Sequence, residues 1–107
     1  MTGFTIHHLA ATIESRASAS ADASYTRRLL EKGPAHCARK LGEEAIETVV
    51  AAVEGDRDHL AAESADLIYH LLVLLKSRDL SLADVEAVLA KRTAASGLEE
   101  KASRGKS

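Results

Sequence analysis

Apolar residues recur at helical spacing through most of the chain, and a short polar stretch separates each apolar run from the next. This spacing predicts helices over residues 4–17, 25–32 and 35–54, a fourth that ends near residue 78, and a last one over 82–93. Val and Ile never alternate with polar residues over the length of a strand. We therefore predict an all-α fold of four to five helices.

Residues that typically begin or end helices lie at these boundaries. Ser24 precedes the second helix as a cap, and Ser81 with Asp84 resembles a capping box at the start of the last. Gly55 is expected to end the third helix, and Asp56 or Asp58 to cap the fourth. The last helix is expected to bury Leu82, Val85, Val88 and Leu89.

The chain of 107 residues is long enough for one domain. We expect that domain over residues 1–95. Residues 96–107 have no periodic apolar face, which predicts a flexible tail.

The third and fourth helices carry paired acids on largely apolar segments. Glu44 and Glu47 lie three residues apart in KLGEEAIETVV, and so do Glu63 and Asp66 in LAAESADLIYHLLVLL. Residues at this spacing share a helix face. Carboxylates are rarely buried unless they are paired or bind a cation, and residues 60–75 contain no Lys or Arg. An antiparallel hairpin would bring the two pairs together, so the pattern predicts a site for a divalent metal ion.

Hard divalent ions prefer oxygen ligands, which favours Mg²⁺, with Mn²⁺ as an alternative. The expected ligands are Glu44, Glu47, Glu63 and Asp66. A di-iron site is not expected, because the Glu-x-x-His pairs of such sites are missing. A zinc site is not expected either, since Cys37 stands alone and no His-x₃-His pair occurs. The alternative for the EExxE run is a solvated helix face.

Composition excludes several classes of protein. The net charge of −2 argues against general binding to nucleic acid or to a membrane surface. No apolar run reaches the about 18 residues of a membrane span, and no signal peptide is expected. A single cysteine, Cys37, excludes an internal disulfide and is typical of a reducing compartment, so we expect a cytoplasmic protein.

Basic residues upstream of the acids suggest an anionic substrate. Metal centres of this kind usually act on phosphates, whose oxygens also need cationic donors. The candidates, each with solvated surface charge as the alternative, are Arg27, Arg28, Lys32, Arg39 and Lys40. Lys40 is the best of them, because it lies one turn before Glu44. His59 and His70 flank the acids of the fourth helix, and His70 either donates a hydrogen bond at the site or is a core or interface histidine.

Three blocks of the chain resemble the phosphoribosyl-ATP pyrophosphohydrolase family. They are SYTRRLLEKG at 24–33, KLGEEAIE at 40–47 and ESADLIYHLLVLL at 63–75. This family belongs to the all-α, MazG-like nucleotide pyrophosphohydrolase superfamily, whose signature is EExxE followed by ExxD. The resemblance covers about residues 6–93 and implies a MazG-like helical bundle completed by dimerisation.

The resemblance also implies an activity. The expected enzyme hydrolyses phosphoribosyl-ATP to phosphoribosyl-AMP and pyrophosphate, the second step of histidine biosynthesis, using Mg²⁺. The motif positions imply metal ligands at Glu44, Glu47, Glu63 and Asp66, and Glu43 as an acid that orients or activates water. Substrate contacts are expected from Lys40 and from the segment of Tyr25, Arg28 and Lys32. A homodimer is implied, with a dimer of dimers as an alternative, and no nucleic-acid or membrane partner.

Two other functions stay open at this point. One is a house-cleaning pyrophosphohydrolase of the same superfamily, acting on a non-standard nucleoside triphosphate or dUTP. The other is a non-catalytic helical dimerisation module whose acids are ordinary surface residues, which predicts no stabilisation by Mg²⁺.

Overall fold

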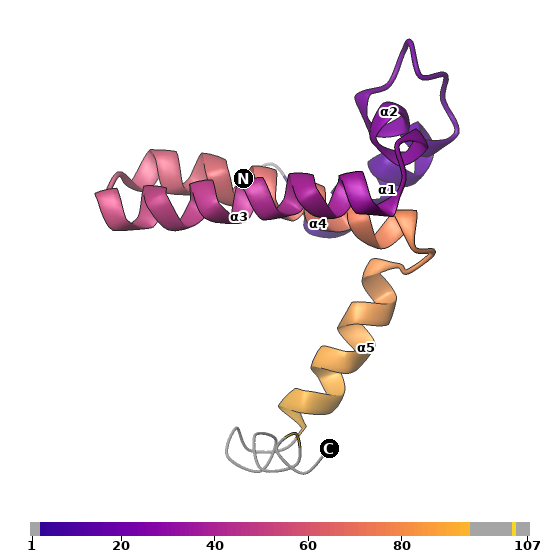
Figure 1. Ribbon diagram of the computed structural model, residues 1–107. Helices are drawn as coiled ribbons and strands as arrows, with labels where there is room; N and C mark the ends of the chain where they lie inside the picture. The colour runs from indigo at the N-terminus through magenta and orange to yellow at the C-terminus, as the bar shows by residue number, and fades with distance from the viewer. Residues whose placement is uncertain (1–2, 95–103, 105–107) are drawn as a thin grey trace.

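A long helical hairpin forms the body of the molecule, with two short helices packed at one end and a fifth helix extending from it (Figure 1). The computed structural model describes residues 3–94 and Arg104. The helices are α1 (Ile6–Ala17), α2 (Tyr25–Glu31), α3 (Pro34–Glu54), α4 (Arg57–Ser77) and α5 (Leu82–Thr93). No strand occurs among these residues, and the all-α prediction is confirmed. The tail predicted for 96–107 lies outside the described residues, apart from Arg104.

The helix ends follow from local chemistry. The Ser24 hydroxyl accepts the backbone N–H of Arg27 at the start of α2, and Ser81 and Asp84 form a reciprocal capping box at the start of α5. Gly55 ends α3 with a φ of +83°, in the left-handed region that a residue with a side chain seldom adopts. Asp56 then caps α4, so the hairpin turns within two residues.

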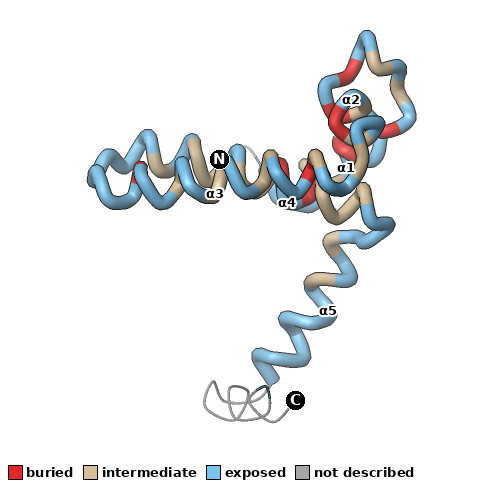
Figure 2. The backbone as a smooth tube through the Cα atoms, in the orientation of Figure 1, coloured by how far each residue is buried: buried red, intermediate tan, exposed pale blue. Residues whose placement is uncertain are grey.

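Helices α3 and α4 run antiparallel, and α1 and α2 cover the end of this hairpin where α3 begins and α4 ends (Figure 1). The buried core lies at that end, as the red segments of Figure 2 show. Its members are Ile13, Leu29, Cys37, Leu72 and Val73. A partly buried hydrogen bond of 2.6 Å between Thr26 Oγ1 and Tyr69 Oη also connects α2 to α4. The base of the hairpin is therefore held by four helices.

The prediction that α5 buries its apolar residues is wrong for the single chain. Leu82 packs against the core and Val85 is half-buried, but Val88 and Leu89 are 49% and 52% exposed. Helix α5 leaves the hairpin at an angle, so no other described element lies against its outer half (Figure 1). The apolar pattern predicted the helix correctly but not a surface to cover it.

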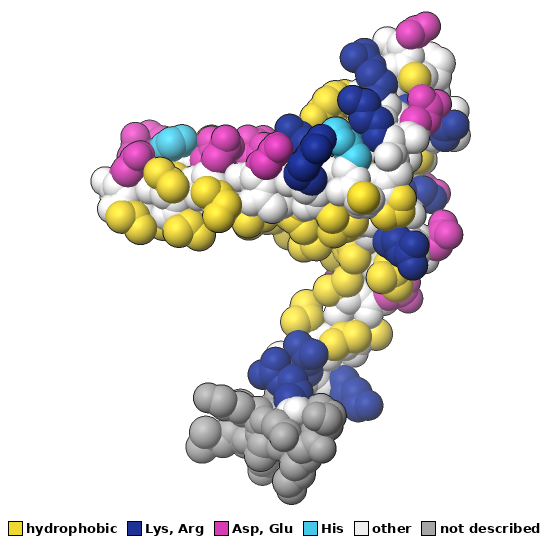
Figure 3. Space-filling model, in the orientation of Figure 1, with side chains coloured by type: hydrophobic (Ala, Val, Ile, Leu, Met, Phe, Trp, Pro, Cys, Tyr) yellow, Lys and Arg dark blue, Asp and Glu magenta, His cyan; other side chains and the backbone are white. Residues whose placement is uncertain are grey.

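Apolar side chains are also exposed along the hairpin itself. On α3, Ile46, Val49 and Val53 are 66%, 60% and 83% exposed. Figure 3 shows hydrophobic side chains along the lower edge of the hairpin and on α5, with the acidic side chains on the opposite edge. The radius of gyration is 16.1 Å, against about 13 Å for a compact chain of about 100 residues. Within the described part of the chain, no helix is sufficiently long and apolar for a membrane crossing.

Candidate metal centre

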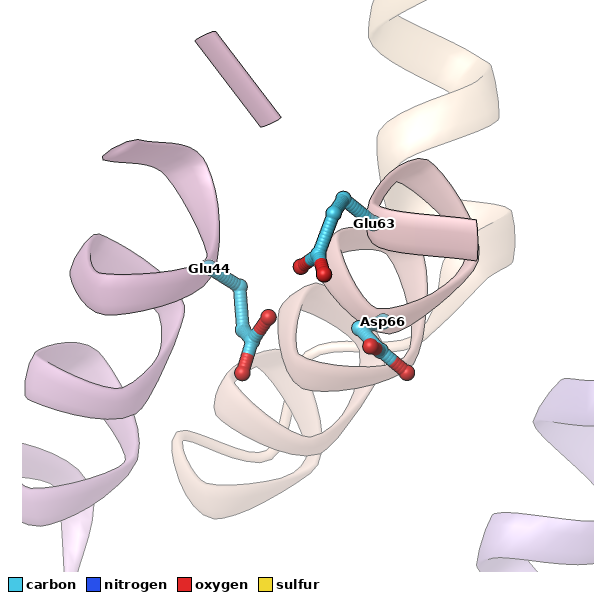
Figure 4. Close-up of side chains that lie close together, drawn as sticks. All are labelled: Glu44, Glu63 and Asp66. Atoms are coloured by element: carbon cyan, nitrogen blue, oxygen red, sulfur yellow. The ribbon is translucent and has the colours of Figure 1, made fainter. Parts of the chain in front are cut away.

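Three carboxylates from two helices converge in the hairpin. Glu44 extends from α3, and Glu63 and Asp66 extend from α4. One oxygen of each lies within 4.8 Å of an oxygen of the other two. Figure 4 shows Glu44 and Glu63 reaching toward each other across the space between the helices, with Asp66 further along α4. Among the described residues this is the one group of three His, Cys, Asp or Glu side chains close enough to share a metal ion.

Two of these side chains hold oxygens that lack partners. Glu44 Oε2 and Glu63 Oε2 are both buried, and neither accepts a hydrogen bond. A buried carboxylate oxygen without a donor is strongly unfavourable. Two oxygens on opposite sides of one octahedral Mg²⁺ are about 4.2 Å apart, close to the spread of this group. The donor set therefore fits a hard divalent cation, and the exposed Asp66 leaves one side open to solvent.

The electrostatics of Glu44 support the same conclusion. Burial, followed by the charges of the neighbouring Glu47, Asp66 and Glu63, raises the pKa of the Glu44 carboxyl to about 6. These acids repel one another at neutral pH, and a cation bound among them would remove that repulsion.

The remaining acids of the EExxE run lie at the edge of this group. Glu47 is exposed and its charge helps to raise the pKa of the Glu44 carboxyl, but it is not one of the three acids that meet within 4.8 Å. Glu43 turns toward Lys40, whose Nζ lies 3.3 Å from Glu43 Oε2. The structure thus groups Glu44, Glu63 and Asp66, places Glu47 beside them and places Glu43 in an ion pair.

Two further residues hold the group in place. The Thr48 hydroxyl lies 2.7 Å from the carbonyl oxygen of Glu44 and 3.2 Å from that of Glu63. His59 Nε2 lies 3.3 Å from Glu63 Oε1. The sequence indicated His59 only as a neighbour of the acids. It did not indicate Thr48, whose spacing of four residues from Glu44 was the sole available signal.

A basic cavity of about 250 Å³ lies close to the carboxylates. Its lining residues are Tyr25, Arg28, Leu29, Lys32, His36 and Lys40. Four of the five predicted substrate-binding residues therefore share one cavity, and Lys40 connects it to Glu43. Arg28 also donates from Nε to the carbonyl oxygen of Ala21, which holds the preceding loop against α2.

His36 also lines this cavity. Its Nδ1 lies 3.1 Å from an Nη atom of Arg39. Partial burial and the charges of Lys32, Arg39 and Lys40 lower the pKa of His36 below 6.5, so its imidazole is neutral at pH 7. A neutral ring beside lysines can still donate a hydrogen bond to an anionic group.

Comparison with known proteins assigns the family. The family model described as phosphoribosyl-ATP pyrophosphohydrolase matches residues 6–93, which is most of the chain. The chain belongs to the phosphoribosyl-ATP pyrophosphohydrolase family. The family resemblance drawn from the sequence, and the expectation of a hydrolase, are thereby confirmed.

Similar proteins cover nearly the whole chain. The phosphoribosyl-ATP pyrophosphatase of Nitrobacter winogradskyi is 69% identical over 106 residues, which span 99% of this chain and 91% of the relative. Phosphoribosyl-ATP pyrophosphatase 1 of Bradyrhizobium diazoefficiens is 66% identical, over 97% of this chain and 98% of its own. The protein of the same name in Rhodopseudomonas palustris is 62% identical, over 97% of both chains.

In this phosphoribosyl-ATP pyrophosphohydrolase family member, His70 is the one predicted substrate-binding residue that does not line the basic cavity. His70 is buried, with its ring edge-on to Tyr69 at 5.1 Å and to Tyr25 at 6.5 Å between centroids. Burial, followed by the charge of Lys40, lowers the pKa of His70, so it is neutral at pH 7. In the isolated chain His70 supports the exposed ring of Tyr25, rather than lining the cavity itself.

Proposed function

We propose that this protein hydrolyses phosphoribosyl-ATP to phosphoribosyl-AMP and pyrophosphate, the second step of histidine biosynthesis, with the help of Mg²⁺. The observation that carries the proposal is the pair of buried, unpartnered oxygens on Glu44 and Glu63, which meet next to Asp66. The substrate is taken from the names of the relatives, which match almost the full length of the chain.

The metal ligands in this proposal are Glu44, Glu63 and Asp66, with Glu47 completing the set from the next turn of α3. Mn²⁺ is an alternative ion for the same oxygen donors. When bound, the metal offsets the charge of the phosphate oxygens and lowers the pKa of bound water. The bulk of the α3–α4 hairpin keeps the ligand side chains at a fixed separation.

The protein's own residues bind and orient the substrate. In the reaction, a water oxygen bonds to the α phosphorus and the water gives up a proton to the solvent. The bond from that phosphorus to the α–β bridging oxygen breaks, and pyrophosphate leaves with the bonding electron pair on this oxygen. Lys32 and Lys40 supply positive charge to the phosphate oxygens from the basic cavity. Tyr25, which is 52% exposed, offers a ring face on which a base can stack. Glu43, held by Lys40, orients the attacking water.

We also propose that the protein acts as a homodimer in the cytosol. The exposed apolar side chains of α3 and α5 form a surface that a second chain would cover. The extended shape of the single chain supports this assembly, because no other described helix covers the end of the hairpin where α3 turns into α4. A buried free thiol at Cys37 suits a reducing compartment.

A turnover assay tests the proposed reaction. The purified protein with Mg²⁺ should convert phosphoribosyl-ATP to phosphoribosyl-AMP and pyrophosphate in equal amounts, as measured by chromatography. Excess EDTA should abolish turnover. Asp66→Asn should lower kcat/KM by at least about 100-fold, because a metal centre contributes several kcal/mol to the transition state. Circular dichroism should show unchanged helix content in this variant.

The same assay separates the alternatives. A house-cleaning enzyme would turn over dUTP or a non-standard nucleoside triphosphate faster than phosphoribosyl-ATP. A non-catalytic module would turn over none of them. Undiminished hydrolysis of phosphoribosyl-ATP in excess EDTA would contradict the metal-dependent mechanism itself.

A further inference from the structure

We infer that Thr48 and His59 are positioning residues, which together hold Glu63 in the orientation that metal binding requires. The inference rests on the metal centre of the proposed function. Thr48 acts on the backbone of Glu63 and His59 acts on its side chain, so the two constraints are separate.

The first constraint joins the two helices at the level of their acids. A threonine inside a helix commonly donates to the carbonyl four residues earlier, as Thr93 does to Leu89 at 2.9 Å. Thr48 makes this contact with Glu44 at 2.7 Å, and its hydroxyl also reaches the carbonyl oxygen of Glu63 on α4 at 3.2 Å. Its one hydroxyl hydrogen is therefore placed between two carbonyls on different helices.

The two carbonyls that the Thr48 hydroxyl reaches belong to Glu44 and Glu63. These are also the residues whose Oε2 atoms are buried without partners. A contact that sets the distance between their backbones also sets the distance between their side chains. Thr48 therefore fixes the register of the two ligand-bearing turns, which side chains as long as glutamate could not fix alone.

The second constraint acts on one of the two carboxylate oxygens of Glu63. His59 Nε2 lies 3.3 Å from Glu63 Oε1. A carboxylate oxygen only accepts, so Nε2 carries the hydrogen. With Oε1 held by His59, the carboxylate cannot rotate freely, and Oε2 stays in the buried position facing the other acids. Hydrogen bonds to ligating carboxylates of this kind orient them toward the metal.

A purely structural role explains the His59 contact poorly. The His59 side chain is 45% exposed, while that of Glu63 is 17% exposed. His59 Nδ1 also lies 3.8 Å from Oε2 of the exposed Glu54 at the end of α3, and exposed ion pairs of this kind add little to folding stability. The core at the other end of the hairpin, with Leu72 and Val73, already holds α4 in place. The effect of the contact therefore falls on the orientation of Glu63.

The test measures Mg²⁺ affinity without substrate, from the rise in melting temperature on titration with MgCl₂. Thr48→Val and His59→Leu should each raise the Kd for Mg²⁺ by about 10- to 100-fold, the usual effect of losing an outer-shell partner. Thr48→Ser and His59→Gln keep a donor at the same place and should restore most of the affinity. The kcat for phosphoribosyl-ATP at sub-saturating Mg²⁺ should fall and recover in parallel.

Two matched controls lie outside the site. Thr93→Val removes a hydroxyl with a contact inside its own helix, and His7→Leu removes a histidine paired with Glu86 at 2.9 Å. Both should leave the Kd for Mg²⁺ unchanged. A positioning role is overturned if Thr48→Val and His59→Leu lower the melting temperature of the metal-free protein but bind Mg²⁺ like the wild type. If the wild-type protein is not stabilised by Mg²⁺ at all, the proposed function fails, and this inference fails with it.

Discussion

At the scale of single residues, Glu44 shows how its surroundings define the site. One of its oxygens is buried without a donor, and other acids surround it. The pKa of its carboxyl is raised from 4.5 to about 6 in the folded protein. A carboxyl whose pKa is higher in the folded state binds its proton more tightly there than in the unfolded chain. This group therefore stabilises the metal-free fold below pH 4.5, and the contribution is lost as the pH rises through 6.

This linkage predicts a pH-dependent difference between the wild type and Glu44→Gln. In EDTA, the wild-type melting temperature should fall relative to that of the variant as the pH is raised from 4.5 to 7. Glutamine cannot ionise, so the difference between the two proteins isolates Glu44 from every other titrating group. A difference in melting temperature that stayed constant over this pH interval would show that Glu44 has an ordinary pKa.

Metal binding should depend on pH in the opposite sense. A carboxylate must lose its proton to bind a cation, so the Mg²⁺ affinity of the wild type should increase between pH 5 and pH 7. The measurement is a calorimetric titration with MgCl₂ at each pH. A constant affinity across this range would show that no ligand titrates there.

At the scale of helices, local patterns were sufficient for most of the predicted structure. Caps and terminators act within a few residues, so Ser24, Gly55 and the pair Ser81 and Asp84 marked helix ends that the structure confirms. The three-residue spacing of the acids likewise placed each pair on one helix face. The sequence could not show the register between α3 and α4. Thr48 was missed because its second acceptor lies on the other helix.

Gly42 within α3 and Gly55 directly after it should respond in opposite ways to substitution by alanine. Gly55 ends the helix with a φ of +83°, so Gly55→Ala should destabilise the protein by about 1–2 kcal/mol through backbone strain alone. Gly42 lies inside the helix with no atom within 4 Å of an added Cβ, so Gly42→Ala should stabilise by up to about 1 kcal/mol. Urea denaturation measures both changes. Equal effects of the two substitutions would contradict the hairpin geometry described here.

At the scale of the whole molecule, the described residues leave two apolar surfaces exposed, one on α3 and one on α5. The sequence predicted which residues of α5 form its apolar face but assigned them to the chain's own core, and the structure places Val88 and Leu89 in solvent. Helical periodicity identifies a face and does not identify the surface that covers it. In the proposed homodimer a second copy covers α5 and the α3 face, and the sequence indicated this second copy only through family resemblance.

This dependence predicts the effect of a charge on the apolar face. The wild-type protein should have twice the chain mass of 11.4 kDa by light scattering. Val49→Glu should shift it toward the single-chain mass, because an unpaired charge in an apolar interface is costly. Val49→Leu, which keeps the position apolar, should remain dimeric. A monomeric wild type, or a Val49→Glu variant with the wild-type mass, would contradict the proposed assembly at this surface.

Crystals grown with Mn²⁺ will show whether the acids of α3 and α4 form a cation site. We expect an anomalous-difference peak between Glu44, Glu63 and Asp66, in contact with the oxygens that are otherwise unpartnered. The same experiment on Glu63→Gln crystals should show a weakened peak or none. Wild-type crystals at saturating Mn²⁺ in which these three side chains are well ordered, with no peak between them, would rule out the cation site.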